Sequence, residues 1–202
     1  MNQDFDQDLD SYHSENIPES SEMKAGRTSL KRITLDILET LFISAVLFLV
    51  INAVSARIRV DGFSMEPSLH SGEFVIVNKL AYKNGSPKRG DVIVFHFPRD
   101  PQQEYIKRVI GLAGDEVVVS NGTVQVNGEV LDEPYILQSP AYSGSWQVPE
   151  GQLFVMGDNR NNSSDSHNWG TLELDYVVGK ALVVYWPVSD WGLVEHYPLT
   201  PR

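Results

Sequence analysis

The chain has 202 residues, of which 42% are hydrophobic, and its formal net charge is −11. This length allows one modest folded domain with additional segments, and the lack of cysteine excludes disulfides, a thiolate nucleophile and cysteine-ligated zinc. The acidity is concentrated, because residues 1–23 carry seven acids and neither Lys nor Arg, whereas the remainder carries 16 basic and 20 acidic side chains. A nucleic-acid-binding surface needs concentrated positive charge, so we expect no nucleic acid partner.

Residues 1–28 are acidic and rich in serine, with few aromatic residues. Such a composition cannot bury enough apolar surface to offset the entropy lost on ordering. We therefore predict a disordered tail, which the positive-inside rule assigns to the cytoplasm. The alternative is a segment that docks to a basic partner.

Residues 33–56 form an apolar run that has no charged residue between Thr40 and Arg57. About 20 helical residues span a hydrocarbon core of about 30 Å, and the run is apolar on all faces, unlike an amphipathic core helix. We predict one transmembrane helix. Four basic residues precede the run and two follow it closely, so the positive-inside rule predicts a cytoplasmic N-terminus.

The run ends in the small residues AVSA, which are typical of processing sites. A cleavable signal sequence is therefore the alternative to an uncleaved anchor, although the long acidic segment ahead of the run favours the anchor. Slow self-processing after Ala56 is a related hypothesis.

Residues 57–202 contain short apolar runs with a period near two, rich in β-branched and aromatic residues. Asn121-Gly122 and Asn127-Gly128 are favoured two-residue hairpin turns. The fold class is therefore mainly β: a compact antiparallel β domain preceded by one N-terminal transmembrane helix, whose predicted orientation makes the domain extracytoplasmic.

Ser64, in the sequence GFSMEPSL, is the candidate nucleophile. The histidines lack HExxH spacing, and no phosphate-binding or calcium loop is present, so we expect no metal and no cofactor. A serine hydroxyl needs a base. His70 or His96 with an aspartate is one option, and Lys107 is the other.

Lys107 and Arg108 are adjacent in a strand-like run, so their side chains should point to opposite faces. The one that faces the core is desolvated, and only a lysine responds to burial by losing its proton. Lys107 is thus the chemically usable base, with a surface lysine at a strand edge as the alternative.

Four ordered segments, GFSMEPSL, KRGDVIVFHFP, YIKRVIGLAGDEV and MGDNRNNSSDSHNWG, resemble bacterial type I signal peptidases over residues 41–184. The resemblance implies a membrane-bound serine endopeptidase that removes signal peptides from exported preproteins. It also implies a Ser/Lys dyad and cleavage after small residues, at sites of the Ala-x-Ala type.

The resemblance implies a role for each matching residue. Ser64 is the nucleophile and Lys107 the general base, and Ser163 orients the lysine amine. The supporting residues are Gly157, Asp158, Arg160 and Asp165, and we expect an ion pair between Arg160 and Asp165. Gly157 should allow a close backbone approach.

The oxyanion should be bound by the backbone N–H of Ser64, at a site where Gly62 replaces the Ser or Thr of some family members. Other departures are Ala113, Asn161 and His167, which replace a common proline, acid and arginine. None of these departures removes the dyad.

The substrate should bind as an added strand. The residues expected to line its pockets, with core packing as the alternative, are Ile58, Val60, Met65, Leu69, Val94, Tyr105 and Ile106. Trp186 and Trp191 could contact lipid or pack in the core, and Phe63 and Met65 could also touch lipid.

Two rival functions remain. A self-cleaving repressor-like Ser/Lys protein would need a DNA-binding helix pair where this chain has its apolar run. An inactive homologue that binds signal peptides would be expected to lack Ser64 or Lys107, and both are present.

Overall fold

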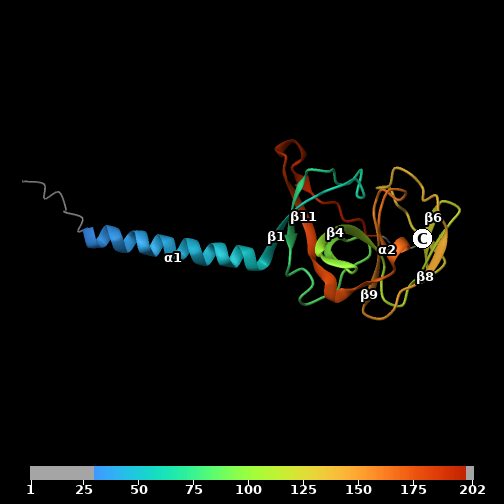
Figure 1. Cartoon of the computed structure of the whole chain (residues 1–202), viewed down its shortest axis with the longest axis horizontal. Coiled ribbons are helices and arrows are strands. Elements are labelled where there is room, and N and C mark those ends of the chain that lie inside the picture. The colour runs from blue at the N-terminus through green and yellow to red at the C-terminus, as the bar shows by residue number, and fades with distance from the viewer. Residues whose placement is uncertain (1–29, 199–202) are drawn as a thin grey trace, which may run out of the picture. The chain divides into compact units, whose positions relative to one another are not determined.

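The computed structural model describes residues 30–198, so the predicted tail at 1–28 lies outside the described residues. Helix α1 (Leu30–Val54) is a single uninterrupted helix (Figure 1). Its 25 residues correspond to about 37 Å at 1.5 Å per residue. Within residues 30–198 it is the one helix long and apolar enough to cross a membrane.

The helix begins three residues before the predicted run and ends two residues before the predicted end at Ala56. Strand β1 (Ser55–Arg59) follows immediately, and Ser55 and Ala56 pair with Asn78 and Val77 of β2 (Phe74–Asn78). Backbone pairing therefore ends the helix, although the sequence is still apolar there. Self-processing after Ala56 would cut within a paired strand.

The larger sheet has eight strands among the described residues, in the order β1-β2-β11-β3-β4-β9-β10, with β12 beside β11. Its remaining strands are β3 (Val92–Phe97), β4 (Asp100–Gly111), β9 (Gln152–Met156), β10 (Leu172–Glu173), β11 (Val177–Trp186) and β12 (Gly192–Leu193). Every strand pair in it is antiparallel.

A second sheet has four strands in the order β7-β6-β5-β8. They are β5 (Glu116–Ser120), β6 (Thr123–Val126), β7 (Glu129–Val130) and β8 (Gly144–Gln147), and all pairs are again antiparallel. Three short helices complete the described chain: α2 (Ser166–Trp169), η1 (Leu174–Tyr176) and η2 (Val188–Asp190). The mainly antiparallel β prediction is confirmed.

The two predicted hairpin turns join the strands of the second sheet. Asn121 and Gly122 connect β5 to β6, and Asn127 and Gly128 connect β6 to β7. All four residues have positive φ, between 50° and 83°, which is the backbone geometry that the two-residue type I′ turn requires. Local turn chemistry thus sets the register of this sheet.

Candidate active site

Ser64 lies in the loop between β1 and β2, next to the segment that follows β9. The backbone N–H of Asn159 donates to the carbonyl of Ser64 at 3.1 Å, and the Asn159 side chain donates to the carbonyl of Phe63 at 3.1 Å. These two bonds hold the serine loop against the end of β9.

The amine of Lys107 lies 2.8 Å from the hydroxyl oxygen of Ser64. It also donates to the carbonyl of Ile106 at 2.9 Å, and the residue is only 4% exposed. Burial lowers the pKa of Lys107 from 10.5 to about 8, and the charges of Asp165 and Asp158 oppose this shift only in part. Near pH 7 the amine is therefore still mostly protonated, but about one tenth of it is neutral, far more than for a lysine with the ordinary pKa.

None of the four described histidines contacts Ser64, so the structure does not support the histidine alternative. His70 lies 3.3 Å from Glu73 and His96 is exposed. His167 contacts Asp165, and His196 contacts two backbone groups. The serine hydroxyl is reached by the lysine instead.

Lys107 and Arg108 point to opposite faces of β4, but the expectation that only one of them is desolvated is wrong. Arg108 is fully buried, and its guanidinium forms two hydrogen bonds with the carboxylate of Asp158, at 2.9 and 2.7 Å. The serine hydroxyl of Ser68 also donates to Asp158, at 2.6 Å. Both faces of β4 are covered here, and the carboxylate of Asp158 compensates the buried guanidinium.

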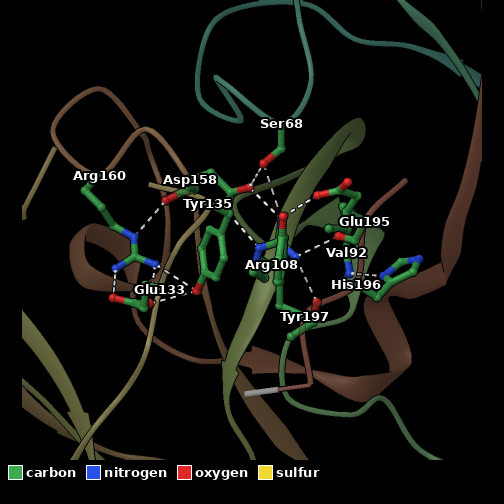
Figure 2. A network of polar contacts seen from close by, with 12 residues as sticks. Ser68, Val92, Arg108, Glu133, Tyr135, Asp158, Arg160, Glu195, His196 and Tyr197 are labelled. Carbon is green, nitrogen blue, oxygen red and sulfur yellow. Dashed lines mark hydrogen bonds and ion pairs between the residues drawn. The ribbon is translucent and has the colours of Figure 1, made fainter. Parts of the chain in front are cut away.

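The predicted ion pair between Arg160 and Asp165 is wrong. Both terminal nitrogens of Arg160 bind the carboxylate of Glu133, at 2.7 and 2.6 Å, and its Nε donates to the carbonyl of Gly157. In Figure 2 the ring of Tyr135 lies between Arg160 and Arg108. Glu133 binds Arg160 because both of its carboxylate oxygens accept hydrogen bonds from the planar guanidinium.

Asp165 is committed to other donors. Its carboxylate accepts the backbone N–H of Gly157 at 2.9 Å, lies 2.6 Å from Nδ1 of His167, and caps the N-terminus of α2. With these partners it has no hydrogen bond to Arg160. Its buried charge still acts on Lys107 through space.

Gly157 lies where the serine loop, Ser163 and the end of β9 meet. A Cβ at this position would lie 2.3 Å from Oγ of Ser163 and 2.4 Å from the carbonyl oxygen of Ser64. The Ser163 hydroxyl is buried and has no hydrogen-bond partner among residues 30–198, so the bond expected between Ser163 and the Lys107 amine is not formed. Only glycine fits position 157 without displacing Ser64.

A groove of about 760 Å³ leads to the Ser64 hydroxyl. Four of the residues predicted to bind substrate line it, namely Ile58, Val60, Tyr105 and Ile106, together with Gly62, Ser64 and Lys107. Met65, Leu69 and Val94 do not line the groove. These three are buried in the core cluster that includes Val60 and Ile106, so core packing describes them.

The backbone N–H of Ser64 is available as a donor. The N–H of Ser64 makes no hydrogen bond within residues 30–198, whereas the N–H of Gly62 donates to Oγ of Ser71 at 3.2 Å. Gly62 has φ +97°, which favours glycine. Its N–H is therefore occupied, and its part is to shape the loop.

Sequence reasoning missed Glu133, Ser68 and the contact of His167 with Asp165. Glu133 belongs to an irregular segment after β7. Such a segment has no periodic pattern from which the direction of its side chain could be predicted. Ser68 is four residues after Ser64, so a turn could have suggested that both lie on one side of the loop.

Comparison with known proteins gives consistent matches. The sequence profile of the family described as signal peptidase, peptidase S26, matches residues 34–186. A probable signal peptidase I-2 of Synechocystis is 39% identical over 187 residues, covering 89% of this chain and 80% of that protein. A probable signal peptidase I-1 of the same organism is 42% identical over 170 residues, covering 80% of this chain and 87% of that protein.

A solved structure is also similar. The crystal structure of a signal peptidase I from Enterococcus faecalis is 32% identical, with a TM-score of 0.45, and the match covers 48% of this chain and 97% of that one.

Proposed function

Because the chain belongs to the signal peptidase family, peptidase S26, we propose that it removes signal peptides from exported preproteins by Ser/Lys dyad catalysis. The observation that carries this proposal is the 2.8 Å contact between the buried Lys107 amine and the Ser64 hydroxyl. Nucleophile and base are within hydrogen-bond reach, as proton transfer requires.

The reaction proceeds by acylation and deacylation. Neutral Lys107 accepts the proton of Ser64, and the serine oxygen attacks the carbonyl before the cut. The N–H of Ser64 donates to the oxyanion. Protonated Lys107 then gives its proton to the leaving amine, and a water, activated by the same amine, hydrolyses the acyl-enzyme.

The substrate binds as an added strand in the groove. Strand β1 is the edge of its sheet, and residues 104–107 of β4 pair with β3 on one side only, since β9 joins β4 from Arg108 onward. Both free edges face the groove, because residues from each line it. An extended peptide can satisfy these backbone groups and place alternate side chains in pockets.

Cleavage after small residues follows from the walls of this groove. Ile58, Val60 and Ile106 supply apolar surface close to Ser64, and Val60 and Ile106 are already packed in the core. A pocket so walled has little room to expand, so we expect alanine before the cut and two residues earlier.

Helix α1 anchors the enzyme in the membrane, with the N-terminus cytoplasmic and the β domain on the other side. Lys31 and Arg32 flank its start, and the first basic residues beyond its end are Arg57 and Arg59. With Lys24 and Arg27 the bias is four to two, which supports this orientation.

Cleavage of one preprotein that carries an Ala-x-Ala site tests the function. The full chain in detergent should release a mature protein whose N-terminus begins directly after the second alanine. Replacing that alanine by leucine should abolish the cut. Release at another bond, or no release, would contradict the proposal.

A further inference from the structure

The segment 192–197, which we call the C-terminal strap, crosses the molecule on the face of β4 opposite Ser64. Its last four residues make specific contacts: the N–H of Val194 donates to Leu182, and the carbonyl of Glu195 accepts from Arg108 at 3.0 Å. The side chain of Val194 is buried in the core cluster of the larger sheet. The strap is thus an integral part of the fold.

The C-terminal strap completes the hydrogen bonding of the Arg108 guanidinium. Nη1 donates to the carbonyls of Gly90 and Glu195, both at 3.0 Å, while Nε and Nη2 bind Asp158. The Tyr197 ring lies 5.3 Å from the guanidinium carbon. Figure 2 shows Arg108 between Asp158 on one side and the strap on the other.

His196 bridges two strands at the point where they separate. Its Nδ1 accepts the backbone N–H of Val92, the first residue of β3, at 3.0 Å. Its Nε2 lies 2.9 Å from the carbonyl of Ala181 in β11 and donates to it. The last direct backbone pair between β3 and β11 joins Ile93 and Lys180. The next pair would be Val92 and Ala181, and there the imidazole bridges the two strands instead.

Only one form of the ring satisfies both contacts. The imidazole must be neutral, with its proton on Nε2, so that Nδ1 can accept a hydrogen bond. Burial lowers the pKa of His196, and the nearby positive charges of Lys180 and Arg108 act in the same direction, against the charge of Asp91. The environment thus favours the neutral form that the geometry needs.

Val92, which His196 holds, is in register with β4, the strand that carries Lys107. Val92 pairs directly with Arg108, and Ile93 pairs with Lys107. Holding Val92 therefore holds the end of β3 against which Lys107 is placed. Arg108, the partner of Val92, is bound by Glu195 of the strap on the face of β4 opposite Lys107.

We infer that His196 is a positioning residue for the peptidase reaction: its neutral ring holds Val92 in register with Arg108 and thereby keeps the Lys107 amine against Ser64. It acts through the backbone of β3 and β4 and touches no reacting group. This inference rests on the proposed function of the dyad.

The test compares His196→Ala with His196→Gln in the full chain. The glutamine amide carries one acceptor and one donor about as far apart as the two ring nitrogens, so it can bridge Val92 and Ala181, whereas alanine cannot. We expect His196→Ala to lower kcat about 10- to 100-fold, since small misplacements of catalytic groups cost this much, with KM little changed. His196→Gln should recover most of kcat.

A control separates positioning from general loss of stability. Val126→Ala opens a cavity in the second sheet, far along the chain from β3, and should lower Tm while leaving kcat unchanged. Hydrogen exchange adds a readout that needs no activity: the amide of Val92 should exchange faster in His196→Ala than in His196→Gln.

The outcomes distinguish this inference from the proposed function. An inactive wild-type chain would contradict the function itself. An active wild type with kcat unchanged in His196→Ala, or with His196→Gln as impaired as His196→Ala, would overturn the positioning role and leave the dyad standing.

Discussion

Lys107 and Ser64 lie 43 residues apart in the sequence, and their side chains meet at 2.8 Å with the amine buried. The contact joins a loop of the larger sheet to its strand β4. Because burial lowers the pKa of Lys107 to about 8, the pair combines reach with a base that can be neutral.

Replacing either member of the pair should abolish cleavage. We expect Ser64→Ala and Lys107→Ala to reduce kcat by about three orders of magnitude or more, because nucleophile or base is lost. Lys107→Arg should be as inactive, since a guanidinium does not give up its proton. Lys83→Ala, at an exposed lysine, is the control and should keep full activity. Wild-type turnover by Lys107→Ala in a preprotein assay would refute the dyad.

Gly157→Ala should damage the site by steric displacement. The added methyl would lie 2.3 Å from Ser163 and 2.4 Å from the carbonyl of Ser64, so the serine loop must move. We expect a loss of about 100-fold in kcat/KM. Gly85→Ala has open space around the new methyl and should behave as wild type. Equal activity of the two variants would show that the close approach is unimportant.

Arg160 should couple energetically to Glu133 and not to Asp165. Removing one partner of a buried pair leaves an unpaired charge and costs about 3–5 kcal/mol. We expect Arg160→Leu and Glu133→Leu each to lower the free energy of unfolding by this amount, and the double variant to lose less than their sum. Urea unfolding followed by tryptophan fluorescence measures this double-mutant cycle and the matching cycle of Arg160→Leu with Asp165→Leu. A larger coupling with Asp165→Leu would contradict the observed pairing.

The segment from Trp186, the last residue of β11, to Trp191 should contact lipid. Trp186 is 54% exposed and Trp191 71% exposed, so the core role considered for them does not hold. In vesicles containing brominated lipid, the full chain should show quenched tryptophan fluorescence. The variant with Trp186→Phe and Trp191→Phe should lose that component, and Trp169→Phe, at a partly buried tryptophan, should keep it. Equal quenching in all three proteins would refute the contact.

The sequence predicted the elements whose cause is local. Asn127-Gly128 forms a turn because Asn and Gly tolerate the positive φ that a two-residue turn requires. Alternation along β4 correctly places Lys107 and Arg108 on opposite faces. The spacing of GFSMEPSL and YIKRVIGLAGDEV led to Ser64 and Lys107 by resemblance to a family.

What sequence reasoning missed depends on contacts between distant segments. The family resemblance implies an ion pair between Arg160 and Asp165, which belong to one segment, yet the partner of Arg160 is Glu133, in a loop 27 residues earlier. Arg108 was not expected to be buried, since its partner Asp158 lies 50 residues away. Met65, Leu69 and Val94 were predicted to line the substrate pockets. An apolar residue near the site can lie in the core or line the groove, and the sequence does not distinguish the two.

The dependence of kcat/KM on pH tests the central claim most directly. Because the pKa of Lys107 is lowered to about 8, the amine is mostly protonated below this pH and mostly neutral above it. The account predicts that cleavage by the full chain rises with pH and levels off with a midpoint near 8. A midpoint near 10.5, the ordinary value for lysine, or a rate independent of pH across this range, would contradict a neutral buried amine as the base.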